Sequence, residues 1–231
     1  MRILLFLLFA VCIVPAYAQQ DKFGYLKEGY LQVFTLSKDG GTPRQLTFEE
    51  NDHWGFDWSH DGRKVFFTAN LHEEGELDPA NSEIYEVDLA TLKVRQITDR
   101  QGPDGNPAVS PDGKKVAYLG YDDRYLGYQA TRLYTMNVDG TDIRLASGDL
   151  DRSIDQFEWG NDGKGIYLSY DDRGNTKIAH LTLDGKLTEI AENVGGTTLG
   201  RPYSSGSFSV SQDGLLAYTY TTTNHPADLT T

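Results

Sequence analysis

Short runs of apolar residues alternate with polar, glycine-containing turns along the chain. One combination of a turn and the apolar run that follows it occurs four times. In its clearest form, the turn 110–113 precedes the apolar run 116–119. Pro111 sets φ at the second turn position, and Gly113 can adopt a positive φ where the chain turns back. A short, continuously apolar run after a turn is typical of a strand buried on both faces. The same pairing occurs at Asp61-Gly62, Asp162-Gly163 and Asp213-Gly214.

These Asp-Gly tips recur about every 50 residues, and a period of this length with short strands is typical of β-propeller blades. The matching stretches Arg-Gln-Leu-Thr at 44–47 and Arg-Gln-Ile-Thr at 95–98 support the same period independently. No helical periodicity follows residue 18. We therefore predict an all-β fold, a β-propeller of four-stranded blades. It has three complete blades plus two half-blades: half-blade 24–47, blades 51–98, 102–146 and 153–191, and half-blade 203–221.

The two half-blades are complementary and can be interpreted in two ways. The N-terminal half (strands three and four) can pair with the C-terminal half (strands one and two) in a closed four-bladed ring, which removes two exposed sheet edges. Alternatively, the chain is a fragment of a larger protein. The fragment is favoured, because the chain ends within a blade and four blades lie at the small end of the usual range.

The first residues have the pattern of a secretory signal peptide. Arg2 precedes an apolar core over residues 3–14, and a small-x-small cleavage site ends at Ala18. A transmembrane anchor is the alternative, but the core is too short to span a bilayer. A lipid anchor on Cys12 is a minor alternative, because Val11 is larger than a lipoprotein site requires. We predict a signal peptide at 1–18 and an exported protein, periplasmic or secreted, at 19–231.

Composition narrows the function classes further. Cys12 is the one cysteine, so the chain after cleavage has neither disulfide nor thiol chemistry. The formal net charge of −13 argues against a nucleic-acid partner and an anionic membrane surface. No stable membrane insertion is expected. The length suffices for one sizeable core.

Two similar acidic stretches are the strongest candidates for binding. Tyr-Asp-Asp-Arg occurs at 121–124 and again at 170–173, each time after the second predicted strand of a blade. These residues could form a polar ring at one mouth of the channel, where acidic groups meet a peptide amine. The favoured alternative is a loop whose aspartates form local turns and pair with the arginine. The candidate substrate-binding residues are Asp122, Asp123, Arg124, Asp171, Asp172 and Arg173.

The histidines and serines predict neither a metal site nor a catalytic nucleophile. His72 stands among acids in the loop 71–82, which is interpreted as solvated because adjacent loop residues rarely supply metal geometry. No serine lies in a nucleophile context, and 204–207 is predicted as an inter-blade turn. We therefore predict no metal, no cofactor and no catalytic residue. The remaining histidines match no metal-binding spacing: His53, His60, His180 and His225.

The tryptophans are predicted to pack between blades. Trp58 and Trp159 each stand three residues before an Asp-Gly tip, so they occupy equivalent positions of the repeat. Trp54 has no such equivalent. Its alternative role is exposed aromatic recognition of a sugar or a peptide.

The repeat resembles that of two related families. Ser-Pro-Asp-Gly-Lys at 110–114, Leu-Tyr to Asp-Gly over 133–140 and Arg-Gln-Leu-Thr at 44–47 resemble the propeller repeat of bacterial TolB-like proteins and of prolyl oligopeptidase-family serine peptidases. The stretches 117–124, 163–177 and 193–203 resemble the exported dipeptidyl aminopeptidase and acylaminoacyl peptidase branch. The resemblance covers roughly residues 30–229.

The resemblance implies a role for the propeller alone. In that family, an α/β-hydrolase domain follows the propeller and carries a serine in Gly-x-Ser-x-Gly, then Asp and His. This chain contains no Gly-x-Ser-x-Gly, so no catalytic residue is carried over and the chain should be inactive alone. The resemblance implies that the propeller gates peptide access to the hydrolase domain, and that this chain is truncated before that domain.

Two other functions stay open. A stand-alone TolB-like periplasmic propeller would act as a protein-binding module that docks envelope proteins. A propeller enzyme acting on carbohydrate would need carboxylates that converge at a defined separation. The continuation of the reading frame beyond Thr231 discriminates the peptidase propeller from the protein-binding module. A hydrolase domain there favours the peptidase, and a natural stop favours the module.

Overall fold

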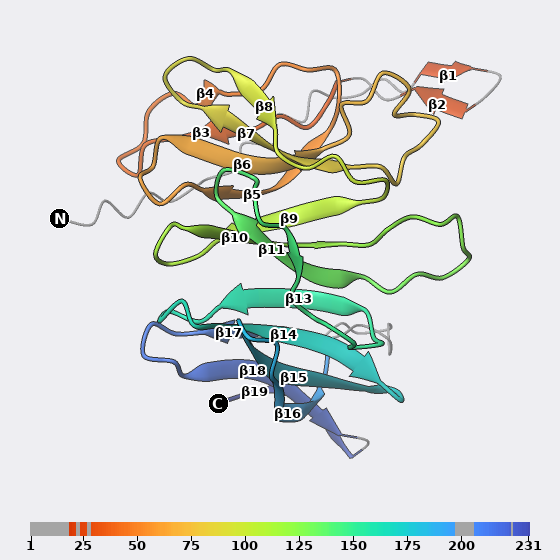
Figure 1. Ribbon diagram of the computed structural model, residues 1–231, viewed down its shortest axis with the longest axis vertical. Coiled ribbons are helices and arrows are strands. Elements are labelled where there is room, and N and C mark those ends of the chain that lie inside the picture. The colour runs from red at the N-terminus through yellow and green to blue at the C-terminus, as the bar shows by residue number, and fades with distance from the viewer. Residues whose placement is uncertain (1–18, 22–23, 27–28, 197–205, 223) are drawn as a thin grey trace. The chain divides into compact units, whose positions relative to one another are not determined.

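Every regular element of the computed structural model is a β-strand (Figure 1), within the residues that it describes: 19–21, 24–26, 29–196, 206–222 and 224–231. The all-β prediction is therefore confirmed for these residues. The predicted signal peptide with Cys12 lies outside them, as do residues 203–205 of the last predicted half-blade. The chain divides into two compact units, residues 1–107 and 108–231. In the described ranges, no helix is long and apolar enough to cross a membrane.

The described residues of the first unit before β9 (Asp104–Val109) form three antiparallel sheets. One four-stranded sheet has the order β5-β6-β7-β8, and its register pairs Phe67 of β6 with Tyr85 of β7. Two smaller sheets, β1-β2 and β3-β4, precede it in the chain. The strands are β1 (Gln19–Asp21), β2 (Gly24–Leu26), β3 (Phe34–Thr35), β4 (Arg44–Gln45), β5 (His53–Trp58), β6 (Lys64–Ala69), β7 (Glu83–Asp88) and β8 (Val94–Gln96).

The core of the first unit joins the sheet β5–β8 to the segment around β3 and β4. Val33 and Leu46 from that segment are buried with Phe67, Tyr85 and Val87. All residues of β6 after its first are buried, as expected for a strand whose apolar run is continuous. This shared burial explains why a two-stranded sheet, marginal by itself, is held in place.

The division between the two units falls within β9, which belongs to a second four-stranded sheet of order β12-β11-β10-β9. The rings of Tyr118 in β10 and Tyr134 in β11 stack with centroids 5.4 Å apart. The strands of this sheet are β9 (Asp104–Val109), β10 (Lys115–Gly120), β11 (Arg132–Asn137) and β12 (Arg144–Leu145).

The last sheet follows the order β13-β14-β15-β16-β18-β17, with β19 paired to β18. The pair Val194 and Tyr220 joins β16 to β18. Residues 225–230 form a third strand of the final repeat, beyond the predicted bounds 203–221. The strands are β13 (Ile154–Trp159), β14 (Gly165–Asp172), β15 (Asn175–Thr182), β16 (Leu187–Val194), β17 (Phe208–Val210), β18 (Leu216–Thr222) and β19 (His225–Thr230).

The four Asp-Gly tips share one turn geometry. At each tip the glycine N–H donates to the carbonyl three residues earlier, as from Gly113 to Ser110 at 2.8 Å. Each of these glycines has a positive φ, between 66° and 80°. The Ser110 hydroxyl donates to Asp112 at 2.7 Å, and this bond and that from the Lys114 N–H lower the pKa of the Asp112 carboxyl. Local turn chemistry therefore explains the repeat signal.

Gly62→Ala tests this backbone requirement cleanly, because no atom lies within 4 Å of the added Cβ while φ is +66°. We expect the free energy of unfolding to fall by about 1–2 kcal/mol, the cost of left-handed backbone for an L-residue. Gly62→Asn should cost less, because asparagine tolerates this conformation. Urea unfolding measures both. Gly127→Ala is the matched control, since its Cβ also enters open space without a positive φ. Equal losses for Gly62→Ala and Gly127→Ala would contradict the prediction.

Trp159 packs between repeats as predicted. Its indole Nε1–H donates to the carbonyl of Ala108 in β9 at 2.9 Å, which ties β13 to the preceding sheet. Trp58 packs against the core that contains Val33 and Leu46. Trp54 is 39% exposed, so its recognition role stays a prediction.

Candidate functional site

The first predicted acidic stretch lies in the connection between β10 and β11. Asp123 Oδ1 accepts hydrogen bonds from the Tyr125 N–H at 2.8 Å and the Gln129 amide at 2.7 Å. The Arg124 N–H donates to Gln129 Oε1 at 2.7 Å. Asp123 therefore organises the loop, while the side chains of Asp122 and Arg124 are exposed. This agrees with the local-turn interpretation for Asp123.

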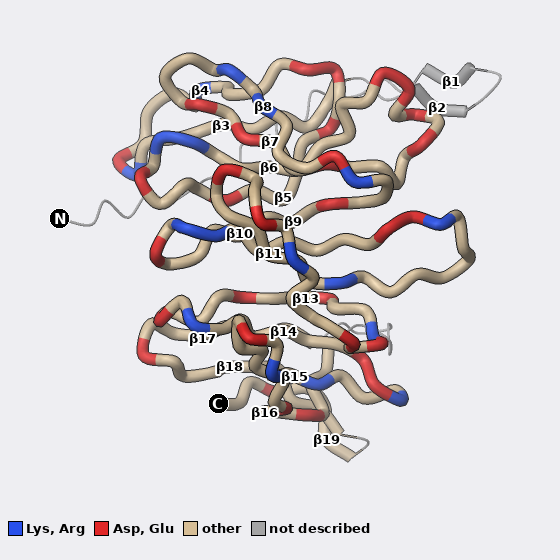
Figure 2. The backbone as a smooth tube through the Cα atoms, in the orientation of Figure 1, with Lys and Arg blue, Asp and Glu red and all other residues tan. Residues whose placement is uncertain are grey.

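The second stretch has a different structure. Strand β14 continues through Asp171 and Asp172, and Arg173 and Gly174 form a two-residue turn with φ of 52° and 80°. The Thr176 hydroxyl donates to Asp171. Acidic and basic residues neighbour each other in both connections (Figure 2). The two similar sequences therefore place their charges on unlike backbones, and peptide binding by these six residues remains a prediction.

Asp172 belongs to an ion-pair network that crosses the last sheet. Arg152 Nη2 lies 3.0 Å from Asp172 Oδ1, and Lys177 Nζ lies 3.4 Å from Oδ2. Lys177 also pairs with Glu189 Oε1 at 3.1 Å, and the Tyr170 hydroxyl donates to the same oxygen at 2.9 Å. The hydrogen bond from Arg152 is the main cause that lowers the pKa of Asp172. Sequence reasoning missed Arg152, Lys177 and Glu189, because strand pairing rather than sequence proximity brings them together.

Arg152→Met should raise the pKa of Asp172, because the substitution removes the main hydrogen bond to the ionised carboxyl. The carboxyl resonance of Asp172, followed by ¹³C NMR through an acid titration, measures this. Arg173→Met is the matched control, and it should leave that pKa unchanged. A rise in Arg173→Met alone would show that the adjacent arginine is the partner, as the sequence motif suggested.

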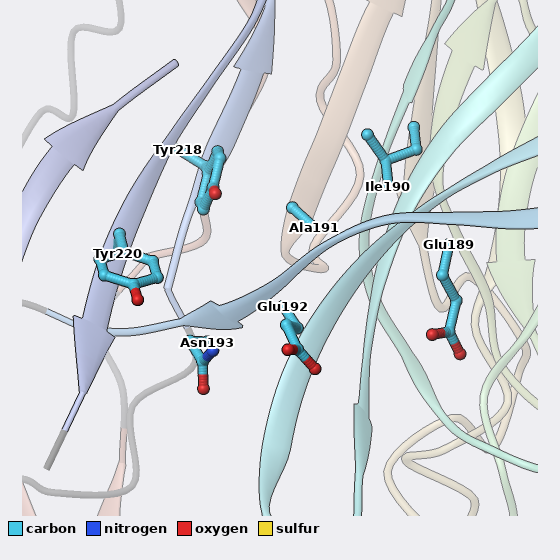
Figure 3. Close-up of a pocket in the computed structure, with 7 residues that line it drawn as sticks. All are labelled: Glu189, Ile190, Ala191, Glu192, Asn193, Tyr218 and Tyr220. Carbon is cyan, nitrogen blue, oxygen red and sulfur yellow. The ribbon is translucent and has the colours of Figure 1, made fainter.

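A pocket of about 460 Å³ opens beside this network, between β16 and β18. Figure 3 shows Glu189, Glu192 and Asn193 projecting from one side of β16, with Tyr218 and Tyr220 on β18. The two tyrosine rings meet edge to face, with centroids 6.5 Å apart and an interplanar angle of 80°. The pocket therefore combines aromatic rings with carboxylates.

The segment of β16 that lines the pocket is irregular. Thr176 pairs with Val194, Ile178 with Ala191 and Ala179 with Glu189, so β16 holds extra residues at two points. Such bulges bend a strand and redirect its side chains. Asn193 has a positive φ of 60°, and its N–H donates to Asn175 Oδ1 at 2.8 Å. This bond holds the bulge against β15.

A buried carboxyl lies in the first unit. Glu83 is 1% exposed and accepts a hydrogen bond from the Thr98 hydroxyl at 2.5 Å. His72 Nε2 lies 3.8 Å from Glu83 Oε1, so the histidine of the acidic loop packs beside this carboxyl instead of being fully solvated. Burial, with smaller contributions from the carboxylates of Asp104 and Asp99, raises the pKa of Glu83 to about 8.

The repeat places a neutral residue at the position equivalent to Glu83. Gln32 stands one residue before the buried Val33, as Glu83 stands before Ile84, and Gln32 Oε1 accepts from the Thr47 hydroxyl at 2.7 Å. Glu83 therefore fills a position that needs an acceptor but no charge. Within the described ranges, no three His, Cys, Asp or Glu side chains converge where they could hold a metal ion.

Part of the chain matches the model of a known family. Residues 13–123 match the model of the dipeptidyl peptidase IV (DPP IV) N-terminal region. The chain is 26% identical over 165 residues to dipeptidyl-peptidase 5 of Porphyromonas gingivalis, an alignment that covers 70% of this chain and 23% of that protein. The chain spans about a quarter of the length of this relative and of the other first curated relatives it matches.

Solved structures establish the fold. A mutant of puromycin hydrolase, crystallised with PGG, aligns with a TM-score of 0.64 at 22% identity, covering 85% of this chain and 32% of that chain. TolB from Acinetobacter baumannii aligns with a TM-score of 0.60 at 19% identity, covering 86% and 45%. The β-propeller fold is thereby confirmed. Together, these matches confirm the predicted resemblance to the N-terminal propeller of a prolyl oligopeptidase-family peptidase.

Proposed function

We propose that this chain is the propeller portion of an exported serine peptidase and gates peptide access to an α/β-hydrolase domain outside residues 1–231. The match of residues 13–123 to the N-terminal region of dipeptidyl peptidase IV carries the proposal. Dipeptidyl-peptidase 5 adds support, because the aligned part is 23% of that relative and leaves room there for further domains. The proposal assigns no catalytic residue to this chain.

A propeller can control access because its sheets are rigid. Antiparallel sheets with close-packed cores deform little, so an opening between them keeps a fixed width. Short or unstructured peptides can pass such an opening, and folded proteins cannot. The six acidic and basic residues at 122–124 and 171–173 are the candidates to meet the peptide on entry, although local turn formation is the favoured interpretation of their sequence.

Export is part of the same proposal. Residues 1–18 carry the signal-peptide pattern, and the formal net charge of −13 suits a protein that stays solvated outside the cytoplasm. The mature protein would be periplasmic or secreted. Cell fractionation with an antibody to residues 29–196 tests this. Retention in the cytoplasm with residues 1–18 still attached would contradict it.

The test of gating uses the product of the complete gene. Dipeptide nitroanilides, a flexible 20-residue peptide and a folded protein containing the same cleavable sequence are compared as substrates. The proposal expects hydrolysis of the first two and none of the third. Unfolding the third substrate beforehand should restore its cleavage. Cleavage of the folded protein at the rate of the flexible peptide would overturn gating, and a product that hydrolyses none of them would overturn the peptidase assignment.

A protein-binding module is the second candidate, and the structural match to TolB favours it. This reading expects a gene product without a Gly-x-Ser-x-Gly segment that is recovered, after crosslinking in cells, with an envelope protein. A reading frame that continues into a hydrolase domain would contradict it.

A further inference from the structure

We propose that the pocket between β16 and β18 binds a guanidinium group, carried by an arginine side chain of a partner polypeptide. The proposal rests on the pocket's own residues and does not depend on the peptidase role. Its lining pairs two tyrosines with two acidic side chains in a space of about 460 Å³.

The aromatic wall favours a cation. A cation over the face of tyrosine is attracted by the ring quadrupole within about 6 Å of the ring centroid. Tyr218 and Tyr220 are half-buried, and their rings lie at 80° to each other, so a cation between β18 and β16 can lie over the face of one of the two rings. A bound anion would face two carboxylates instead.

The two carboxylates of the pocket differ in whether they already have partners. Glu189 is already engaged by Lys177 at 3.1 Å and 3.2 Å and by Tyr170 at 2.9 Å. Glu192 has neither an ion pair nor a side-chain hydrogen bond with any described residue, and its side chain is exposed. The Glu192 carboxylate is therefore available to accept hydrogen bonds from a ligand. The Glu189 carboxylate adds negative charge near the pocket, which Lys177 partly neutralises.

The position of Glu192 is held before any ligand arrives. It lies in the bulge between Ala191 and Val194, and the neighbouring Asn193 donates its N–H to Asn175 Oδ1 at 2.8 Å. The Asn175 amide in turn donates to Asn193 Oδ1 at 3.3 Å. An acceptor on an anchored strand loses less freedom on binding than one on a loose loop.

A guanidinium fits these groups better than an ammonium. It is planar and stacks on aromatic rings while its fork of N–H donors meets a carboxylate with two parallel bonds. Its methylene stem can lie along apolar surface, which Ile190 and Ala191 supply at the pocket. The formal net charge of −13 adds long-range attraction for a basic partner.

The test titrates the full chain with N-acetyl-arginine methylamide and follows it by ¹H–¹⁵N NMR. We expect saturable shifts concentrated at Glu192, Tyr218 and Tyr220. The matched probes are the citrulline analogue, which keeps the shape without the charge, and the lysine analogue, which keeps the charge without the fork. Citrulline should cause no saturable shift, and lysine should bind at least threefold more weakly than arginine.

Variants locate the site. Glu192→Gln should weaken arginine binding about tenfold, and this exposed substitution should leave the fold intact. Asp149→Asn, an exposed carboxylate elsewhere in the same unit, is the control and should change affinity less than twofold. Tyr220→Phe should bind as the wild type does, because the ring face remains. Unchanged affinity in Glu192→Gln, equal binding of citrulline, or equal binding of lysine would each overturn the proposal.

Discussion

Phe67→Ala should lower the free energy of unfolding by about 3–5 kcal/mol, the usual cost of removing a buried phenylalanine ring. Phe67 has no exposed surface and lies in the core that contains Val33 and Leu46. Its ring stacks on Tyr85 with centroids 5.7 Å apart and meets His53 at 5.2 Å. The substitution leaves a cavity in the core that holds the sheet β5–β8 and the segment around β3 and β4 together.

Urea unfolding followed by tryptophan fluorescence measures the loss, since Trp54 and Trp58 lie in the neighbouring strand β5. Phe67→Leu keeps most of the volume and should cost less than half as much. Phe48→Ala is the matched control, because Phe48 is 63% exposed and should contribute less than about 0.5 kcal/mol. A loss for Phe67→Ala no greater than that control would show that residues 29–47 do not pack on β6 in solution.

Glu83→Gln should remove a pH dependence of stability. The pKa of Glu83 is about 8 in the folded chain against an ordinary 4.5, so folding favours the protonated carboxyl. Its stabilising effect is complete below pH 4.5 and is lost as the pH rises toward 8. One pKa unit corresponds to about 1.4 kcal/mol, so we expect a loss of about 3 kcal/mol between pH 5 and pH 8. Glutamine keeps the acceptor for Thr98 but carries no charge.

The measurement is urea unfolding at pH 5, 6, 7 and 8. Wild type and Glu83→Gln should be similar at pH 5, and the variant should be more stable by about 3 kcal/mol at pH 8. Comparing the two at each pH cancels the contribution of titrating groups that lie away from Glu83. Glu74→Gln, an exposed residue of the loop that precedes β7, should behave as the wild type does. A constant difference between wild type and Glu83→Gln at all pH values would show that Glu83 does not titrate in this range.

The strands could be predicted where the evidence is local. An Asp-Gly tip followed by an apolar run places β6, β10 and β14 correctly, because turn formation and burial on both faces depend on adjacent residues. Strand β19 escaped prediction because its sequence, His-Pro-Ala-Asp-Leu-Thr, is mostly polar and lacks a strand pattern. It is a strand because β18 pairs with it, as Tyr218 does with Thr230.

The candidate site was predictable only in part. The repeated Tyr-Asp-Asp-Arg suggested two equivalent loops, yet the residues that follow decide the backbone. Gly174 with Asn175 permits a tight hairpin, whereas Tyr125 and Leu126 continue into an open connection. The pocket was not predictable at all, because it needs the bulges of β16 and the approach of β18.

The amino-acid sequence by itself determined the repeat, the turns and the all-β class, since each follows from interactions between residues a few positions apart. Only the tertiary structure decided the pKa values and the ion-pair partners of the polar groups. Burial raises the pKa of Glu83 to about 8, and Asp172 pairs with Arg152, twenty positions earlier in the chain, because β13 lies beside β14. Desolvation and ion pairing depend on which strands become neighbours, and the register of the sheets sets that.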